Sequence, residues 1–320
     1  MTEIGLGLQS DKRPGDYARL AALAEDCGFD VLSVFGDLLY QPPIAPLLEM
    51  AGATSRVRLG AACWNPFTTH PYEIAGQVAA LDAVSDGRAY LGLARGSWLG
   101  GIGVEQRRPV TTVLEAAAVV RALLAGEDFE GSVFRLSPGT RLRYPVRRPE
   151  VPLLIGTWGP RLAAAAGRVA DEVKIGGTAN PKMVEVLRER LGNPDVGIVA
   201  GAVTVVSEDS RAARARARRE VAMYLDVVAS LDPTAGVPAD LLARIRSRLA
   251  AGDEAAAGAL IPDDVLDLFA FSGTPEQIAE QAQQLLDAGA ARVEFGTPHG
   301  LTDDEGVALL GRRVLPLLRR

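Results

Sequence analysis

The chain of 320 residues contains only two cysteines and two histidines. Cys27 and Cys63 lie far apart in the sequence, and neither belongs to a CxxC pair. This spacing argues against a disulfide framework, and the shortage of thiol and imidazole groups argues against a zinc site. We therefore expect a protein of a reducing compartment that holds no metal ion.

Long apolar runs and long basic runs are also missing. No run of about 18 apolar residues occurs, so we expect no transmembrane helix and no membrane partner. The first residues, MTEIGLGLQSDKR, lack the positive start and apolar core of a signal peptide. The net charge is −6 and no basic stripe is present, so we expect no nucleic-acid partner. Together these absences predict a cytoplasmic protein.

Several short motifs that carry chemistry are absent as well. The sequence has no GxGxxG dinucleotide fingerprint, no P-loop, no GxSxG elbow and no HExxH pair. These absences argue against a Rossmann dehydrogenase, a P-loop NTPase, an α/β-hydrolase and a zinc protease. The function must rest on another arrangement of residues.

What the sequence does contain is a regular alternation of apolar strand-like runs and amphipathic helix-like runs. Short apolar runs that are mostly followed by helices indicate parallel strands with helices outside. Eight such runs predict an α/β fold of the TIM (β/α)8 barrel type, as a single domain over residues 1–320. The runs are 4–8, 31–35, 58–64, 89–94, 151–156, 172–177, a segment within 195–206, and 291–296. Two insertions interrupt the pattern: residues 127–150 predict a hairpin or loop, and residues 207–272 predict extra helices.

Unusual residues follow the predicted strands, at the end of a barrel where active sites lie. The loop NPFTTHP after the third strand carries Asn65 and one of the two histidines. Asp37, Trp98, Trp158 and His299 follow other strands. All three tryptophans and both histidines thus map to loops at the predicted mouth, which favours a large planar ligand there.

Two glycine-containing loops at the mouth have two interpretations. IGTWGPR places Gly156 and Gly159 before a helix, and KIGGTANPK places Gly176 and Gly177 after the sixth strand. Backbone N–H groups at such helix starts bind phosphate, but glycines also simply make tight turns. Together the two loops favour a phosphate-bearing cofactor. Lys174 and Glu294 lie inside strands, and their side chains point either into the barrel, near the mouth, or outward between helices.

The stretch WNPFTTHPYEIAGQVAALDAVSDGRAYLGLARG resembles the matching stretch of the bacterial-luciferase-like superfamily. It is most similar to the branch that includes coenzyme F420-dependent methylenetetrahydromethanopterin reductase. VPLLIGTWGPRLAAAAGRVADEVKIGGTANPK and FAFSGTPEQIAEQAQQLLDAGAARVEFGTP extend the resemblance over nearly the whole chain. The resemblance implies a TIM barrel with an insertion and an F420 or FMN cofactor at the strand carboxyl ends.

The resemblance also assigns roles to residues. It implies a bulge with a non-prolyl cis peptide near Ala61, Ala62 and Cys63, against which the cofactor ring lies, and a carboxylate near the ring at Asp37. Asp37 is then the candidate catalytic residue, and Trp64, Trp98 and His299 are candidate substrate-binding residues. The candidate cofactor-binding residues are Asp37, Ala61, Ala62, Cys63, Asn65, Gly156, Thr157, Trp158, Gly159, Gly176 and Gly177.

One departure from the family bears on the reaction. Many members carry Asp-His after the second strand, and in the sugar-phosphate dehydrogenases that histidine is the catalytic base; here the pair is Asp37-Leu38. The predicted function is therefore hydride transfer from reduced F420 to an activated C=N or C=C bond of a small organic substrate. The alternatives are an FMN-dependent monooxygenase and a non-enzymatic binding protein on the same barrel. The resemblance also implies a homodimer.

Overall fold

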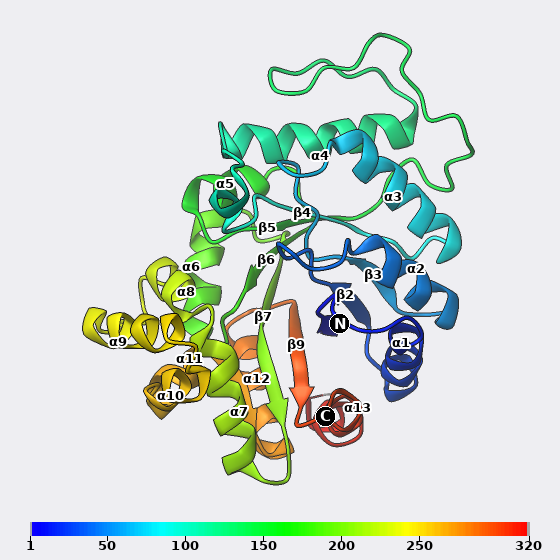
Figure 1. The fold of residues 1–320 in the computed structure, drawn as a ribbon. Helices are drawn as coiled ribbons and strands as arrows, with labels where there is room; N and C mark the ends of the chain where they lie inside the picture. The colour runs from blue at the N-terminus through cyan, green and yellow to red at the C-terminus, as the bar shows by residue number, and fades with distance from the viewer. Residues whose placement is uncertain (1, 319–320) are drawn as a thin grey trace.

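The computed structural model describes residues 2–318 as a barrel of parallel strands surrounded by helices (Figure 1). Strand order around the barrel is β4-β5-β6-β7-β9-β1-β2-β3. Bridges between Leu59 and Ala89 and between Trp64 and Leu93 join β3 to β4 and close the ring. The barrel strands are β1 (Glu3–Leu8), β2 (Val31–Val34), β3 (Arg58–Ala61), β4 (Leu91–Ala94), β5 (Leu153–Gly156), β6 (Glu172–Gly176), β7 (Gly197–Val206) and β9 (Arg292–Gly300).

All eight predicted strands are present, and the TIM-barrel prediction is confirmed. A further strand, β8 (Ala270–Gly273), pairs with β7 outside the ring and was not predicted. Its four residues follow a helix directly and precede the Thr274 cap of the next helix, so no separate apolar run marks them.

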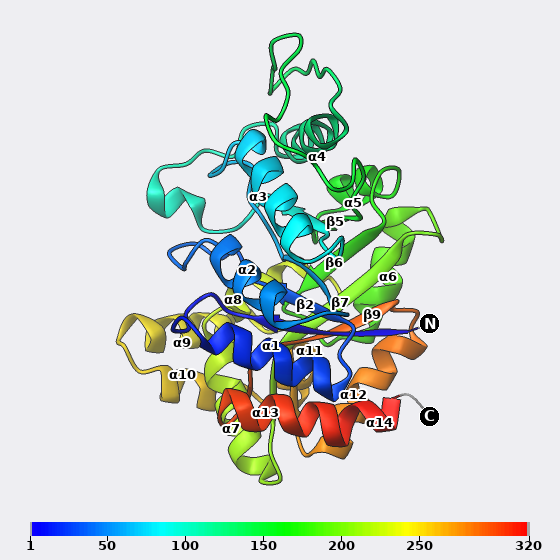
Figure 2. The same ribbon diagram turned by 90° about the vertical axis from the view of Figure 1, so that its right-hand side faces the viewer.

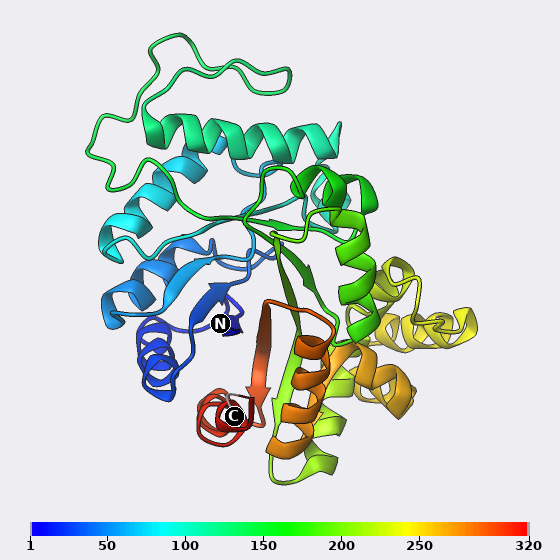
Figure 3. The ribbon, with the colours of Figure 1, turned by 180° about the vertical axis from the view of Figure 1, so that it is seen from behind.

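Helices cover the outside of the barrel, which is seen from behind in Figure 3. Their capping follows sequence signals: the Thr274 and Gln277 side chains form a capping box at the start of α12, as their spacing predicts. No helix among residues 2–318 is long and apolar enough to cross a membrane. The surrounding helices are α1 (Asp16–Cys27), α2 (Ile44–Ala53), α3 (Pro71–Val84), α4 (Pro109–Ala125), α5 (Pro160–Ala166), α6 (Pro181–Leu191), α7 (Ser210–Ala222), α12 (Pro275–Asp287), α13 (Asp303–Leu309) and α14 (Leu315–Leu318).

The two predicted insertions differ in structure. Residues 127–150 form an irregular loop with one antiparallel bridge, between Glu130 and Arg135, and the loop projects beyond α4 (Figure 1). The segment 207–272 is mainly helical, as predicted. After α7 it contains α8 (Leu225–Leu231), α9 (Ala239–Ala250), α10 (Glu254–Ala259) and α11 (Asp263–Phe269). Figure 2 shows α9 and α10 at the end of the barrel opposite to the start of β1.

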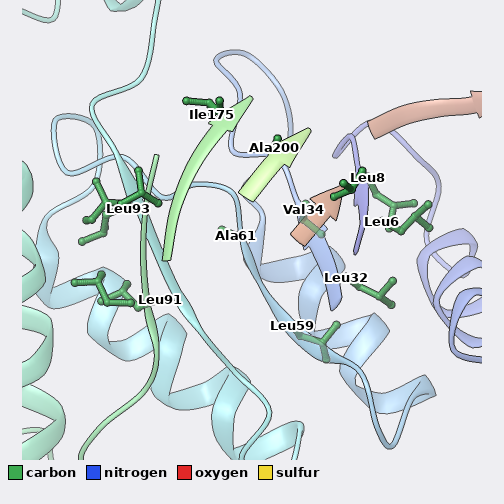
Figure 4. Packing of buried hydrophobic residues seen from close by; sticks show 14 of the residues in the cluster. Leu6, Leu8, Leu32, Val34, Leu59, Ala61, Leu91, Leu93, Ile175 and Ala200 are labelled. Carbon is green, nitrogen blue, oxygen red and sulfur yellow. The ribbon is translucent and has the colours of Figure 1, made fainter. Parts of the chain in front are cut away.

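Alternate strand residues pack outward against the helices. Leu6, Leu32, Leu59 and Leu91 belong to one buried apolar cluster between the strands and the helix layer (Figure 4). The inward positions between them are often glycine, and a Cβ atom at Gly60 would lie 2.6 Å from the Tyr90 ring. Small inward residues therefore leave the barrel interior to a few large side chains.

Charged side chains share this interior with apolar ones. Val31, Tyr90, Leu154 and Val199 form a small apolar cluster of their own. At the amino end of the strands, the fully buried Arg292 lies 3.2 Å from the Glu172 carboxylate, and Arg58 pairs with Glu3 and Glu172. The open, carboxyl end is where a ligand has room to enter.

Candidate active site at the carboxyl ends of the strands

A cavity of about 1110 Å³ opens at the carboxyl ends of the barrel strands. Loops after six barrel strands and residues of β7 and β9 themselves contribute to its lining, so the cavity lies where the barrel rule places an active site. Most of the predicted site residues line it: Asp37, Ala62, Cys63, Trp64, Asn65, Trp98, Gly156, Thr157, Trp158, Gly159, Gly176 and Gly177. The prediction that a large ligand site gathers the three tryptophans agrees with this placement.

Two predicted residues lie outside the lining. Ala61 is fully buried at the end of β3, one residue before the part of the bulge that faces the cavity. His299 is fully buried within β9, and its Nε2 lies 3.0 Å from the Gly7 carbonyl oxygen. The prediction that His299 belongs to a mouth loop is wrong because β9 extends to Gly300 and carries His299 into the protein interior. Burial also lowers the pKa of His299 to about 4, so its ring is neutral at ordinary pH.

The bulge after β3 carries a cis peptide bond between Ala62 and Cys63, as the family resemblance implied. The Cys63 carbonyl comes so close to Gly36 that any side chain at position 36 would collide with it. Burial raises the pKa of the Cys63 thiol to about 12, so the thiol stays protonated. It lines the cavity as a neutral group and does not act as a nucleophile.

The loop that follows is held by polar side chains. Trp64 donates from Nε1 to the Gln77 side chain at 2.8 Å, which fixes the buried indole at the cavity wall. The Asn65 side chain accepts from the Phe67 N–H and donates to the Arg95 carbonyl oxygen, so it joins the loops after β3 and β4. His70 accepts from the Tyr72 N–H and caps α3, and it does not reach the cavity lining.

Asp37 faces the cavity from the loop after β2. Its carboxylate accepts a hydrogen bond of 2.9 Å from the Gln9 side chain, which follows β1. Asp37 remains exposed to solvent, but the protein atoms around its carboxyl group partly desolvate it and raise its pKa; the Gln9 hydrogen bond and the charge of Lys174 oppose this rise without cancelling it. A carboxyl group with a raised pKa is more often protonated near neutral pH, and it can donate that proton inside the cavity.

Lys174 and Glu294 point into the barrel and form a buried ion pair at the cavity floor. The Lys174 ammonium also lies 5.1 Å from the centre of the Phe35 ring. Glu294 accepts a second hydrogen bond, of 2.6 Å, from the Ser33 hydroxyl, which lies 2.8 Å from the Tyr90 hydroxyl. Burial alone would raise the pKa of Glu294, but the charges of Lys174 and Arg292 and these hydrogen bonds outweigh it and lower the pKa. Of the two orientations that the sequence left open, the inward one is correct.

The two glycine loops lie side by side, since Trp158 donates from Nε1 to the Gly176 carbonyl oxygen at 3.0 Å. Gly159 is the N-cap residue of α5. Because glycine has no side chain, the cap residue offers no side-chain acceptor to the first N–H groups of that helix. The second loop is different, because the Gly177 N–H already donates to the Gly201 carbonyl oxygen at 2.7 Å. Gly177 therefore shapes the cavity and packs near Val228, and of the two loops only the first leads into a helix without a side-chain cap.

Small residues line four adjacent strand ends. Ala62, Ala94, Gly156 and Gly176 follow or end β3, β4, β5 and β6, and all four line the cavity. A Cβ atom at Gly176 would meet nothing closer than the Lys174 side chain at 3.9 Å, so it would point into open space. We call this set the small-residue wall. Its lack of projecting side chains leaves room for a flat ring system.

Several lining residues were not predicted. Gln9 and Lys12 follow β1, and Arg161 lies in the first turn of α5. The rule that placed Asp37 at the mouth applies equally to the polar residues QSDK after the first strand. Gln9 and Lys12 could therefore have been predicted from the sequence. Tyr224, which precedes α8, and Val227, within α8, had no such signal because they belong to an insertion.

Comparison with known proteins adds independent information. The model of a family described as luciferase-like monooxygenase matches residues 1–292. A 5,10-methylenetetrahydromethanopterin reductase of Methanolobus tindarius is 28% identical, over 93% of this chain and 95% of its own length. An F420-dependent glucose-6-phosphate dehydrogenase of Nakamurella multipartita is also 28% identical, over 96% of this chain and 93% of its own.

Among solved structures, the coenzyme F420-dependent tetrahydromethanopterin reductase of Methanopyrus kandleri has the same fold. It superposes with a TM-score of 0.90 at 24% identity, covering 98% of this chain and 99% of that one. The arrangement of strands, helices and insertions is therefore one that a known enzyme also adopts.

Proposed function

The chain belongs to the luciferase-like monooxygenase family, and from this premise we propose that it is a coenzyme F420-dependent oxidoreductase. We propose further that it acts as a reductase on an activated C=N or C=C bond of a small organic substrate. The names of its relatives support the cofactor, since the reductase from Methanopyrus kandleri and the dehydrogenase from Nakamurella multipartita are both described as F420-dependent.

The observation that carries the proposal is the small-residue wall, which lines the same cavity as Asp37. A flat ring can lie against Ala62, Ala94, Gly156 and Gly176 without displacing any side chain, and a Cβ at Gly176 would occupy that space. The cavity is also large enough for a cofactor of this size, since single-ligand pockets hold about 300–1,000 Å³. The residues present therefore fit a deazaflavin.

The charged part of such a cofactor also finds partners. Arg95 and Arg161 line the cavity after β4 and β5, and neither has a carboxylate partner among residues 2–318. The uncapped start of α5 adds N–H groups beside Arg161. In this proposal the first glycine loop and Arg161 hold the phosphate, while Ala62, Cys63, Gly176 and Gly177 border the ring.

When bound, the deazaflavin supplies a hydride from its C5 carbon. The chain's own residues do the rest. Asp37, oriented by Gln9, holds a proton at its carboxyl group and delivers it to the substrate atom that receives no hydride. Trp64 and Trp98 line the cavity and reduce the access of water. Leu38 stands where a histidine base would be, which supports reduction over alcohol oxidation.

We also propose that the protein works in the cytoplasm as a homodimer, without a nucleic-acid or membrane partner. The two free cysteines support the cytoplasmic location, the net charge of −6 supports the lack of a nucleic-acid partner, and the homodimer rests on the family resemblance. Light scattering behind a sizing column measures the dimer directly, and a mass of one chain would contradict it.

The test is anaerobic oxidation of reduced F420 by a panel of imines and enones, followed at the F420 absorbance band. The proposal predicts substrate-dependent oxidation that continues without oxygen. Reduced FMN offered with oxygen is the second arm, and oxygen consumption coupled to product formation with FMN alone would assign a monooxygenase instead.

A further inference from the structure

Large apolar side chains that water reaches are concentrated at the mouth of the cavity. Ten such side chains are exposed among residues 2–318, and five of these line the cavity. Isolated exposed apolar residues are ordinary, but a group gathered around one opening indicates a binding surface. The five, which we call the apolar rim, are Leu39 (88% exposed), Trp98 (57%), Met223 (53%), Tyr40 (48%) and Ile102 (46%).

The apolar rim comes from three separate segments. Leu39 and Tyr40 belong to the loop after β2, Trp98 and Ile102 to the loop after β4, and Met223 follows α7. Less exposed apolar residues continue this surface into the cavity: Leu38, Leu99, Val110, Val227 and Leu231. The rim is thus the outer part of an apolar wall of the cavity, to which these deeper residues also belong.

Three of the five basic residues that line the cavity, Lys12, Lys174 and Arg216, are already paired. The Lys12 ammonium lies 2.9 Å from Asp303 and 3.1 Å from Asp11. Arg216 donates to the Leu301 carbonyl oxygen and lies 3.8 Å from Glu220. The other two are unpaired: Arg95 lies in the loop after β4 that also carries Trp98, and Arg161 lies in the first turn of α5. In the proposed function both face the charged part of the cofactor. With the cofactor bound, a charged substrate at the wall would lose water without gaining a free counter-charge, which is unfavourable.

The apolar rim lies at the open mouth of the cavity, whose volume of about 1110 Å³ is just above the range of about 300–1,000 Å³ for pockets of drug-sized ligands. A cofactor against the small-residue wall, at the strand ends, would leave the side chains of the rim open to a second ligand.

We propose that this second ligand, the substrate, is an uncharged, bulky and mostly apolar molecule of the fused-ring carbonyl class, and that the apolar rim binds it. The inference rests on the proposed function for the identity of the first ligand. When the fused rings pack against Trp98, Leu39 and Met223, their apolar surface leaves water, and this burial supplies the binding free energy.

Calorimetric titration of the protein, loaded with oxidised F420, tests the inference by binding and not by turnover. The probes are androstenedione, a neutral four-ring enone, cyclohexenone, its one-ring counterpart, and a carboxylated cyclohexenone. We expect androstenedione to bind at least about tenfold more tightly than cyclohexenone, because it buries more apolar area. The carboxylated probe should bind more weakly than cyclohexenone.

Two variants locate the site. Leu39 and Trp98 have positive φ angles of 69° and 57°, which asparagine tolerates, so Leu39→Asn and Trp98→Asn remove apolar surface without straining the backbone. Each should weaken androstenedione binding by about tenfold or more and leave the Kd of F420 unchanged. Tyr72→Ala is the matched control, since Tyr72 is an exposed aromatic residue outside the lining, and it should change neither Kd.

The outcomes separate this inference from the proposed function. If F420 binds but androstenedione binds no better than cyclohexenone, or if both asparagine variants bind it normally, the substrate class is wrong and the proposed function stands. Failure of F420 itself to bind contradicts the proposed function, and the same titrations without cofactor then test the apolar rim. A dimer that dissociates in the Leu39→Asn/Trp98→Asn variant with unchanged androstenedione binding would assign the rim to a second copy of the chain and overturn the inference.

Discussion

Asp37 is the residue on which the proposed chemistry depends. It combines a hydrogen bond from Gln9, a place in the cavity lining and a raised pKa. An acid donates a proton only while it is protonated, so the reductive rate should fall as the pH rises through the raised pKa of Asp37.

Replacement of Asp37 by asparagine keeps the size of the side chain and its ability to form hydrogen bonds, but it removes the acidic proton. We expect Asp37→Asn to lower kcat by about 10² or more and to abolish the fall of rate at high pH. Steady-state rates between pH 5 and 9 measure both effects. An Asp37→Asn enzyme with wild-type kcat would show that the proton comes from elsewhere.

The electrostatic environment of Asp37 supplies a second readout. The charge of Lys174 lowers the pKa of Asp37, so Lys174→Met should raise that pKa and move the descending limb of the rate profile to higher pH. A limb that stays in place would mean that the titrating group is not Asp37.

Lys174 also neutralises the buried Glu294, and its removal should cost stability. In the wild type the pKa of Glu294 is lowered, so its stabilising contribution is present above the ordinary glutamate pKa and is lost as the pH falls through the lowered value. In Lys174→Met the carboxylate is buried without that partner, and we expect a loss of about 3–5 kcal/mol at pH 7 in urea unfolding. The loss should be smaller at pH 5, where Glu294 protonates more readily, and Lys174→Met/Glu294→Leu should recover most of it.

At the scale of elements, one carboxylate of α4 binds the backbone of the loop 127–150 directly. Glu115 accepts hydrogen bonds from the backbone N–H groups of Ser132, Val133 and Phe134 and from the Ser132 hydroxyl. Desolvation is the largest single cause and raises the pKa of Glu115, but these donors together outweigh it and lower the pKa to about 2. The attachment should therefore persist above the ordinary glutamate pKa and be lost as the pH falls through about 2.

Glu115→Gln should loosen this loop without unfolding the barrel. An amide offers one acceptor oxygen in place of two, so trypsin should cut at Arg135, Arg141 or Arg143 severalfold faster, while Tm changes little. Glu127→Gln is the matched control, because Glu127 is an exposed carboxylate at the start of the same loop. Equal cleavage rates in the two variants would show that Glu115 does not anchor the loop.

At the scale of the whole molecule, the barrel closes around glycines that make room for large inward side chains. Gly60→Ala would place a Cβ atom 2.6 Å from the Tyr90 ring, and overpacking of this kind costs about 1–3 kcal/mol. Gly100→Ala is the control, since a Cβ there meets nothing within 4 Å. Urea unfolding of both variants measures the difference. Equal stability would mean that the Tyr90 ring can move to accommodate the added methyl group.

The sequence was sufficient for the barrel because eight apolar runs and their helices repeat one local pattern. It was also sufficient for most of the mouth, since Asp37, Trp98 and the glycine loops follow directly from strand ends. The orientation of the Lys174 and Glu294 side chains was not predictable. In a short buried strand, the register alone decides whether a charged side chain points into the barrel or outward. His299 was misplaced because β9 continues through Thr297 and Pro298, whose X-Pro bond and turn-like composition indicate a loop.

The most direct test of the central claim is a paired fluorescence titration of the protein with F420 and with FMN. The account predicts saturable F420 binding with weak or absent FMN binding. It also predicts that Gly176→Leu, which fills the small-residue wall, abolishes F420 binding, while Gly52→Leu in α2, outside the cavity lining, leaves it intact. FMN preference, or F420 binding that survives Gly176→Leu unchanged, would contradict the account.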